Sequence, residues 1–223
     1  MGKKKLKRFA ENITFSHLFQ YPYEELIKGF PLKGKWNEDY FHNNHPIILE
    51  LGCGKGEYSI FLAKKYPDKN FIGIDIKGAR LWRGSKTVEE ENLKNVAFVR
   101  TKIQLITLFF GPGEISEIWI TFPDPQPRKS KESKRLNSPA FLKRYNEILR
   151  KEGIIHLKTD NEAMFDYMLE IIEREGHRLI QAERDVYGGG YEGDANAIRT
   201  FYEEKFNRDG STIKYVEFQL HYE

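Results

Sequence analysis

Short apolar runs and amphipathic segments alternate along most of this chain, starting near Ile47. An apolar run bounded by turn residues is typical of a buried strand, whereas apolar positions recurring every three or four residues indicate a helix. The pattern predicts helices at Glu57–Tyr66, Gly78–Asn92, Pro139–Lys151 and Glu162–Glu175, with a short helix through Leu105 and Phe109. It predicts strands at Ile47–Glu50, Asn70–Asp75, Val96–Arg100, Glu117–Phe122, Ile154–Lys158, Leu179–Ala182 and Lys214–Leu220.

The alternation of strands and helices predicts the fold class. Such units form a parallel sheet, and the last two strands lack a strong intervening helix. We therefore expect an α/β, Rossmann-like fold: a mostly parallel, doubly wound seven-stranded sheet with an antiparallel finish. Residues 1–44 are expected to form an N-terminal basic arm and packing extension, and residues 45–223 the main domain. Within the extension, Lys3–Arg8 is expected to be a solvated arm, whereas Phe15 and Leu18 are expected to pack rather than line a substrate cleft.

Length, charge and cysteine content narrow the possible functions. At 223 residues the chain is long enough for one sizeable α/β domain. A net charge of +3 does not by itself indicate a nucleic-acid partner, but basic residues cluster in Lys3–Arg8 and again in Arg128–Arg135. The single cysteine, Cys53, excludes an internal disulfide and fits a reducing compartment. Without a long apolar run we expect no membrane span, and the simplest location is the cytoplasm.

A glycine-rich loop follows the first predicted strand. Its spacing, Gly52-Cys53-Gly54-Lys55-Gly56, is G-x-G-x-G rather than the G-x-G-x-x-G of dinucleotide sites. Glu50 before it suits a ligand that brings positive charge, such as the sulfonium and ammonium of S-adenosylmethionine. Asp75, at the end of the second strand, is placed to hold a ribose hydroxyl pair. A generic nucleotide-binding turn, such as that of a dehydrogenase, is the alternative.

A second candidate site follows the fourth predicted strand. Pro123, Pro125 and Pro127 cannot continue a strand and fix an extended loop that presents Asp124. A carboxylate held there can accept hydrogen bonds from the N1–H and exocyclic N–H₂ of a guanine. The basic run Arg128–Arg135 comes next and is suited to phosphates, so a nucleic-acid substrate is indicated. The plainer alternative is a solvated turn with a charge run.

At this point the chain resembles the bacterial tRNA (guanine-N7)-methyltransferase family, which acts on the variable-loop guanine. The motifs that carry the resemblance follow one another in family order from residue 47 to near the C-terminus. They are ELGCGKG at residues 50–56, GIDIKGAR at 73–80, FPDPQPRK at 122–129, KRL at 134–136, LKTDN at 157–161 and TFYEEKF at 200–206.

The resemblance implies a class I S-adenosylmethionine-dependent methyltransferase acting on tRNA, with Asp124 as the catalytic carboxylate. The residues expected at the methyl donor are Glu50, Gly52, Gly54, Gly56, Asp75, Lys102 and Asp124. Those expected at the tRNA are Arg128, Lys129, Lys134, Arg135, Asp160, Thr200, Phe201, Tyr202 and Glu203.

Three positions depart from the family pattern. Gln126 stands where a tryptophan is usual between the loop prolines, and Arg128 replaces the usual lysine. Lys102 stands near the position of an Asp or Asn expected to bond the adenine amino group. Two alternatives therefore stay open: a methyltransferase acting on another RNA or on a protein, and a non-catalytic RNA-binding protein that keeps the donor fold.

No metal is expected. His42 and His45 are spaced like a weak metal pair, but two asparagines lie between them and further ligands are lacking. The expected partner is tRNA, and the chain is expected to be a monomer or a homodimer without a membrane partner.

Overall fold

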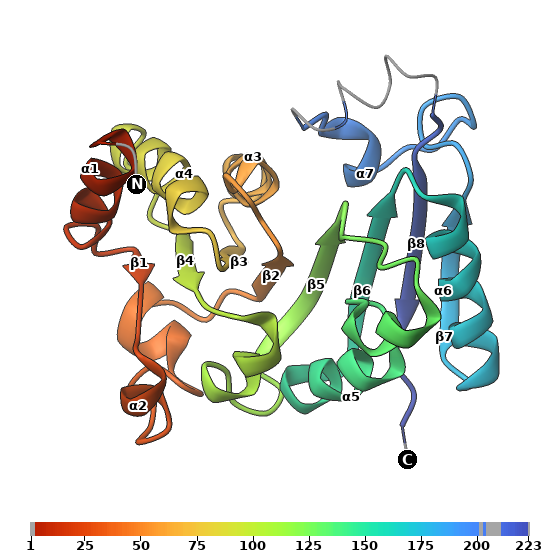
Figure 1. Ribbon diagram of the computed structural model, residues 1–223, viewed down its shortest axis with the longest axis horizontal. Coiled ribbons are helices and arrows are strands. Elements are labelled where there is room, and N and C mark those ends of the chain that lie inside the picture. The colour runs from red at the N-terminus through yellow and green to blue at the C-terminus, as the bar shows by residue number, and fades with distance from the viewer. Residues whose placement is uncertain (1–2, 201–202, 204–210, 223) are drawn as a thin grey trace. The chain divides into compact units, whose positions relative to one another are not determined.

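The computed structural model describes residues 3–200, 203 and 211–222, and it divides into two compact units after Ser116 (Figure 1). Each unit carries its own strands, and each is described separately below.

The first unit is built on parallel strands in the order β1-β4-β3-β2. β2 (Ile47–Leu51), β3 (Asn70–Asp75) and β4 (Val96–Arg100) pair in parallel, with Leu51 opposite Ile74 and Asp75 opposite Arg100, so they end at one edge. Every residue of β2 and β3 is buried, as the continuous apolar runs predict for parallel strands. The remaining elements after β2 are helices α3 (Glu57–Lys65) and α4 (Gly78–Glu90) and the 3₁₀ helix η2 (Ile103–Leu108).

The N-terminal segment of this unit is more ordered than predicted. It contains α1 (Lys3–Asn12), β1 (Leu18–Phe19), α2 (Tyr23–Leu26) and the π-helix η1 (Trp36–Phe41). The charged side chains of α1 are solvated from residue 5 to residue 8, but the predicted arm is a helix held to α4: the Asn12 amide donates to the Gly78 carbonyl at 2.9 Å. Phe15 and Leu18 are buried, as predicted.

The second unit carries strands in the order β5-β6-β8-β7. They are β5 (Ile115–Thr121), which begins at the boundary, β6 (Leu149–Thr159), β7 (Arg178–Glu183) and β8 (Lys214–Gln219). β8 pairs antiparallel with both β6 and β7, which is the predicted antiparallel finish. Helices α5 (Pro139–Ile148), α6 (Glu162–Arg174) and α7 (Asp194–Ala197) and the 3₁₀ helix η3 (Lys129–Lys134) complete the unit.

The predicted α/β class is confirmed, and two details change. The described residues form eight strands rather than seven, because β1 pairs in parallel with β4 through only two residues. The helix predicted through Lys151 ends at Ile148, and β6 begins at Leu149 instead of the predicted Ile154, since the exposed Arg150–Glu152 residues offer no apolar side chain to extend the buried face of the helix. The division at residues 44 and 45 remains a prediction.

Candidate active site

The glycine loop, residues 52–56, joins β2 to α3 in a conformation that depends on glycine. Gly52, Gly54 and Gly56 have φ angles of +75°, +59° and +72°, in the left-handed region where a side chain is strained. The N–H groups of Gly52 and Cys53 donate to the Ile74 carbonyl at 2.8 and 2.9 Å. The loop is thereby fastened to the end of β3.

One side of the glycine loop is packed and the other is open. A Cβ on Gly56 would lie 2.5 Å from the Phe98 ring, and a Cβ on Gly84 of α4 would collide with the same ring and with the loop backbone. A Cβ on Gly52 or Gly54 would meet nothing within 4 Å. The loop therefore rests on Phe98 and keeps space beside Gly52 and Gly54, as a ligand approaching the backbone requires.

Two buried carboxylates flank this loop. Glu50 accepts hydrogen bonds from the backbone N–H and the hydroxyl of Ser59, at 2.9 and 2.6 Å. Asp75 accepts from the backbone N–H of Gly54 at 3.0 Å. Burial, and then the charges of Glu50 and Asp75, raise the pKa of the Cys53 thiol well above its ordinary value. The thiol therefore stays neutral in a negative environment, which suits a cationic ligand.

Lys102 lies at the same edge of the first unit. It lies two residues after the end of β4, is exposed, and directly precedes η2. The structure thus brings together the predicted donor residues Glu50, the glycine loop, Asp75 and Lys102 at the carboxyl ends of β2, β3 and β4, where ligands of parallel sheets bind.

In the second unit, β5 leads into the acceptor loop, residues 122–128. Phe122 has a φ of +48° and its N–H donates to the Lys158 carbonyl at 2.8 Å. Asp124 is exposed, and its Oδ1 accepts a hydrogen bond from the Gln126 N–H at 3.1 Å. With three prolines around it, this carboxylate is held in a set direction while remaining accessible.

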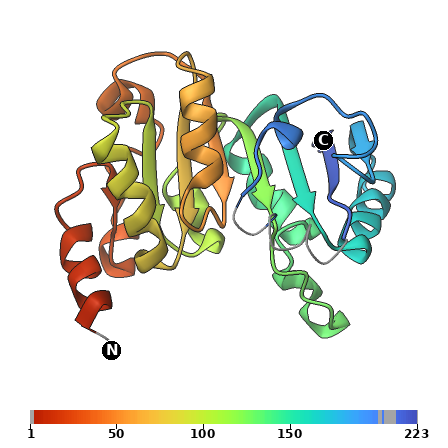
Figure 2. The same ribbon diagram turned by 90° about the horizontal axis from the view of Figure 1, so that it is seen from above.

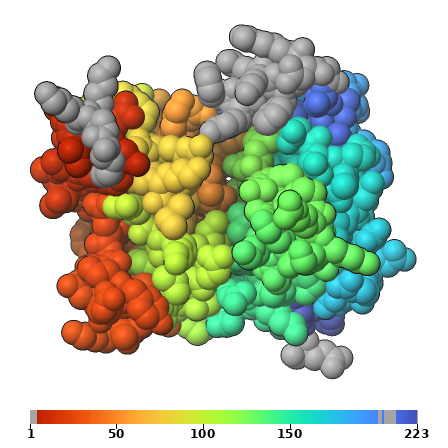
Figure 3. All heavy atoms as spheres, in the orientation of Figure 1, coloured from red at the N-terminus to blue at the C-terminus, as the bar shows by residue number. Residues whose placement is uncertain are grey.

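The basic cluster, residues 128–135, projects from the second unit in Figure 2 and forms a prominent green surface in Figure 3. Arg128, Lys129 and Lys134 are exposed. Arg135 is different: its Nε donates to the Gln126 carbonyl at 3.2 Å, and its guanidinium lies 4.5 Å from the centre of the Tyr167 ring. Arg135 therefore anchors the cluster to the acceptor loop, and the other cations face solvent.

The other protein residues predicted to contact the tRNA lie in two places in the second unit. Asp160 directly follows β6, and its carbonyl accepts from Lys214 at 3.2 Å. Thr200 and Glu203 bond reciprocally: the Thr200 N–H donates to Glu203 Oε2 at 2.7 Å, and the Glu203 N–H donates to the Thr200 hydroxyl at 3.3 Å. Glu203 is fully buried, so its carboxylate serves contacts inside the unit. Phe201 and Tyr202 lie outside the described residues.

Comparison with known proteins identifies the family. A family model described as "Putative methyltransferase" matches residues 44–216. The tRNA (guanine-N(7)-)-methyltransferase of Christiangramia forsetii is 52% identical, covering 98% of this chain and 99% of that protein. The enzyme of the same name from Porphyromonas gingivalis is 50% identical, covering 93% of this chain and 86% of that protein. The chain belongs to the tRNA (guanine-N(7)-)-methyltransferase family. The predicted resemblance is confirmed.

A solved structure supports the fold of this family member. The crystal structure of a SAM dependent methyltransferase from Aquifex aeolicus superposes with a TM-score of 0.54, covering 97% of this chain and 98% of that one. Its sequence identity is 14%, so the likeness concerns the fold alone.

Gln126, where the family pattern usually has tryptophan, has a φ of +43°. Its N–H donates to Asp124 and its carbonyl accepts from Arg135. The backbone of Gln126 therefore connects the acceptor carboxylate with the basic cluster whatever side chain it carries.

Sequence reasoning missed three residues that shape these sites. Phe98 supports the glycine loop, but a phenylalanine in an apolar strand gives no signal of that role. Lys158 and Tyr187 both bond to Glu203. For Lys158, the one available signal was a lysine at the end of an apolar strand, within the LKTDN motif in which Asp160 is the residue expected at the tRNA.

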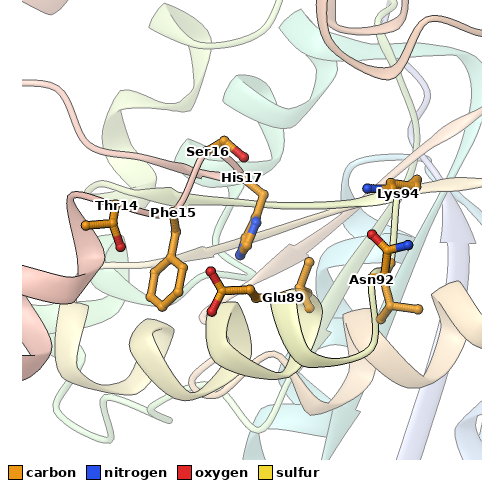
Figure 4. A pocket seen from close by; sticks show the side chains of 9 residues that line it. Thr14, Phe15, Ser16, His17, Glu89, Asn92 and Lys94 are labelled. Atoms are coloured by element: carbon orange, nitrogen blue, oxygen red, sulfur yellow. The ribbon is translucent and has the colours of Figure 1, made fainter.

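A pocket of about 180 Å³ lies elsewhere in the first unit, between residues 14–17, which precede β1, and the end of α4 with the turn that follows it (Figure 4). The His17 ring nitrogen Nε2 lies 3.0 Å from the Ser85 carbonyl, and burial lowers the pKa of this histidine. None of the predicted site residues lines this pocket, so it does not belong to the candidate site.

The residues that the structure describes contain no cluster of three or more histidine, cysteine, aspartate or glutamate side chains suited to a metal ion. No helix among them has the length and apolar character needed to span a membrane.

Proposed function

We propose that this protein transfers a methyl group from S-adenosylmethionine to N7 of the variable-loop guanine, guanine-46, of tRNA, forming 7-methylguanosine. The observation that carries the proposal is the 52% identity to a tRNA (guanine-N(7)-)-methyltransferase over nearly the full length of both chains. We further propose that the enzyme acts in the cytoplasm, where a tRNA substrate is available, and that it is a monomer or a homodimer.

The donor side of the proposal rests on the first unit. S-adenosylmethionine, when bound, supplies an electrophilic methyl group on a sulfonium. The open space beside Gly52 and Gly54 allows close approach to the backbone, and Glu50 and Asp75 provide negative charge beside it. We assign Asp75 to the ribose hydroxyls and Glu50 to the cationic part of the donor. Lys102 is assigned to the adenine end.

The acceptor side rests on Asp124. Guanine N7 has a lone pair and no proton, so it attacks the methyl carbon without a general base. The N7–C bond forms as the S–C bond breaks, and the positive charge of sulfur passes to the purine ring. The Asp124 carboxylate accepts hydrogen bonds from the guanine N1–H and N–H₂ and stabilises the charge that develops. Alignment of the two reacting atoms is the other main contribution.

The tRNA backbone is assigned to the basic cluster. Arg128, Lys129 and Lys134 are exposed next to the acceptor loop, and cations there neutralise phosphates. Arg135 holds the cluster to that loop. We also assign Asp160, Thr200, Phe201 and Tyr202 to substrate recognition, with the buried Glu203 acting through its bond to Thr200.

The test is methylation of unmodified tRNA transcripts by the purified protein, with the modified position mapped by borohydride–aniline cleavage. We expect one cleavage, at the variable-loop guanine, and none in a transcript where that guanine is replaced. Methylation at other positions would indicate a different RNA substrate. Donor binding without any methylation would indicate another substrate class or a non-catalytic RNA-binding protein.

A further inference from the structure

Lys158 occupies an unusual place for a charged side chain. It lies in β6, and its side chain is fully buried. Its ammonium pairs with the carboxylate of Glu203, which is also fully buried, and donates to the Ile198 carbonyl at 3.0 Å and the Tyr187 hydroxyl at 3.3 Å. The Tyr187 hydroxyl in turn donates to Glu203 at 2.6 Å.

Lys158, Tyr187 and Glu203 are called the Lys158 cluster here. A contribution to the stability of the fold does not by itself explain why this cluster is buried. Removing two charges from water is costly, and apolar residues of similar volume often replace a buried ion pair without loss of stability. The same burial, opposed by Glu203 and assisted by the nearby Arg199, lowers the pKa of Lys158 to about 8. Hydrogen-bonded charges instead fix one arrangement of the segments that carry them.

The residues bonded to Lys158 belong to the parts of the chain that are assigned to the tRNA substrate. The Lys158 carbonyl accepts from the N–H of Phe122, two residues before Asp124, so the backbone of Lys158 holds the start of the acceptor loop. Its side chain holds Glu203, whose carboxylate also accepts from the Thr200 N–H. One residue is therefore bonded to both the acceptor loop and the segment from Thr200 to Glu203.

We propose that Lys158 is a positioning residue for the tRNA: by binding Glu203 and Tyr187 it fixes Glu203, and through it Thr200, relative to the acceptor loop. The inference rests on the proposed function of the same site. It gives the buried carboxylate of Glu203 a role inside the unit, as the partner of Lys158. The donor residues Glu50 and Asp75 belong to the other unit and take no part in these contacts.

The experiment compares Tyr187→Phe and Lys158→Met with the wild type and with Tyr145→Phe. Tyr145 is the matched control, because its hydroxyl donates to the Leu136 carbonyl at 2.8 Å, as the Tyr187 hydroxyl lies within 3.4 Å of the Ile198 carbonyl, and because its side chain is buried. For each protein, kcat and KM for tRNA, the Kd for S-adenosylmethionine and the thermal midpoint are measured.

We expect Tyr187→Phe to fold and to raise the KM for tRNA by about two- to tenfold, the effect of one lost hydrogen bond. Lys158→Met is expected to raise it further, with the donor Kd unchanged in both. The Tyr145→Phe control should lower the thermal midpoint without changing the KM. If Lys158→Met does not fold, Tyr187→Phe decides the matter.

Two results would overturn the inference: folded variants with the KM of the wild type, or a fall in kcat, donor affinity and thermal midpoint together, which marks a structural role only. Failure of the wild-type protein to methylate tRNA would instead reject the proposed function. The two failures are therefore distinguishable.

Discussion

The carboxylate of Asp75 accepts a hydrogen bond of 3.0 Å from the backbone N–H of Gly54, joining the end of β3 to the glycine loop. Its other oxygen accepts from the Lys77 N–H at 2.7 Å. One charged group therefore shapes the loop and supplies negative charge beside the space over Gly54.

Asp75→Asn should weaken the binding of S-adenosylmethionine about ten- to a hundredfold, since a neutral amide is a poorer acceptor than a carboxylate. Isothermal titration calorimetry of the folded variant measures this directly. Asp68→Asn removes an exposed carboxylate in the same unit and should leave the Kd unchanged. Equal donor affinity in Asp75→Asn and the wild type would remove Asp75 from the donor site.

Gly84 offers a test of the support beneath the same loop. In a helix, glycine to alanine usually stabilises, but a Cβ at this position would collide with the Lys55 backbone and the Phe98 ring. We expect Gly84→Ala to lower the free energy of unfolding by about 1–3 kcal/mol, as overpacking does. Displacement of the loop should also weaken donor binding. Urea denaturation and calorimetry measure the two effects, with Thr87→Ala at a half-buried position of α4 as the control. A more stable Gly84→Ala protein would show that α4 moves away freely.

The order of strands and helices was predictable because each apolar run or helical period depends only on residues that are close together in the sequence. β1 was not, since a two-residue strand has no period of its own and exists only by pairing with β4. The helix α1 was also missed, because its stabilising contact with Gly78 lies 66 residues away.

The same difference, between features set by neighbouring residues and contacts made across the chain, separates the predicted site residues from those that were missed. Glu50, the glycine loop and Asp124 stand in motifs whose spacing carries the chemistry. Lys158 acquires its role from Ile198 and Glu203, and the Lys158–Ile198 contact spans 40 residues of chain. A linear pattern does not contain such a contact.

Asp124→Asn should lower kcat while the protein still binds its substrates. The amide keeps the size of the side chain but loses the charge that stabilises the developing purinium, and such a loss typically lowers kcat by about a hundredfold or more. Single-turnover methylation of tRNA measures this, with the Kd values for tRNA and donor measured alongside. A kcat within threefold of the wild type (about 0.7 kcal/mol) would mean that Asp124 is not the catalytic carboxylate.

The exposed members of the basic cluster should differ from its anchor. Lys129→Ala is expected to weaken tRNA binding and to reduce the slope of log K against log salt by about 1, the effect of one phosphate contact. Arg135→Ala should also raise the mobility of the acceptor loop, because it removes the bond to the Gln126 carbonyl. Lys33→Ala, an exposed lysine of the first unit, serves as the control for charge alone. An identical salt slope for Lys129→Ala and the wild type would place the phosphates elsewhere.

The lowered pKa of Lys158 predicts that pH has opposite effects on the stability of the protein and on its binding of tRNA. Burial lowers its pKa in the folded protein from 10.5 to about 8. Between these pH values the unfolded chain binds more protons than the folded one, so the contribution of Lys158 to stability rises as the pH increases through this window. The facing groups are Glu203, Tyr187 and Arg199; burial and Glu203 raise the pKa of Tyr187, so it stays protonated there.

Tyr187 and Glu203 lose their cationic partner as Lys158 becomes neutral, so kcat/KM for tRNA should fall above about pH 8 while the Lys158 contribution to stability increases. Activity profiles and urea denaturation from pH 7 to about pH 10 measure the two trends. In Lys158→Met both should be absent, leaving only the pH dependence of the other groups. If the fall in kcat/KM at alkaline pH persists unchanged in Lys158→Met, another residue causes it, because methionine has no proton to lose.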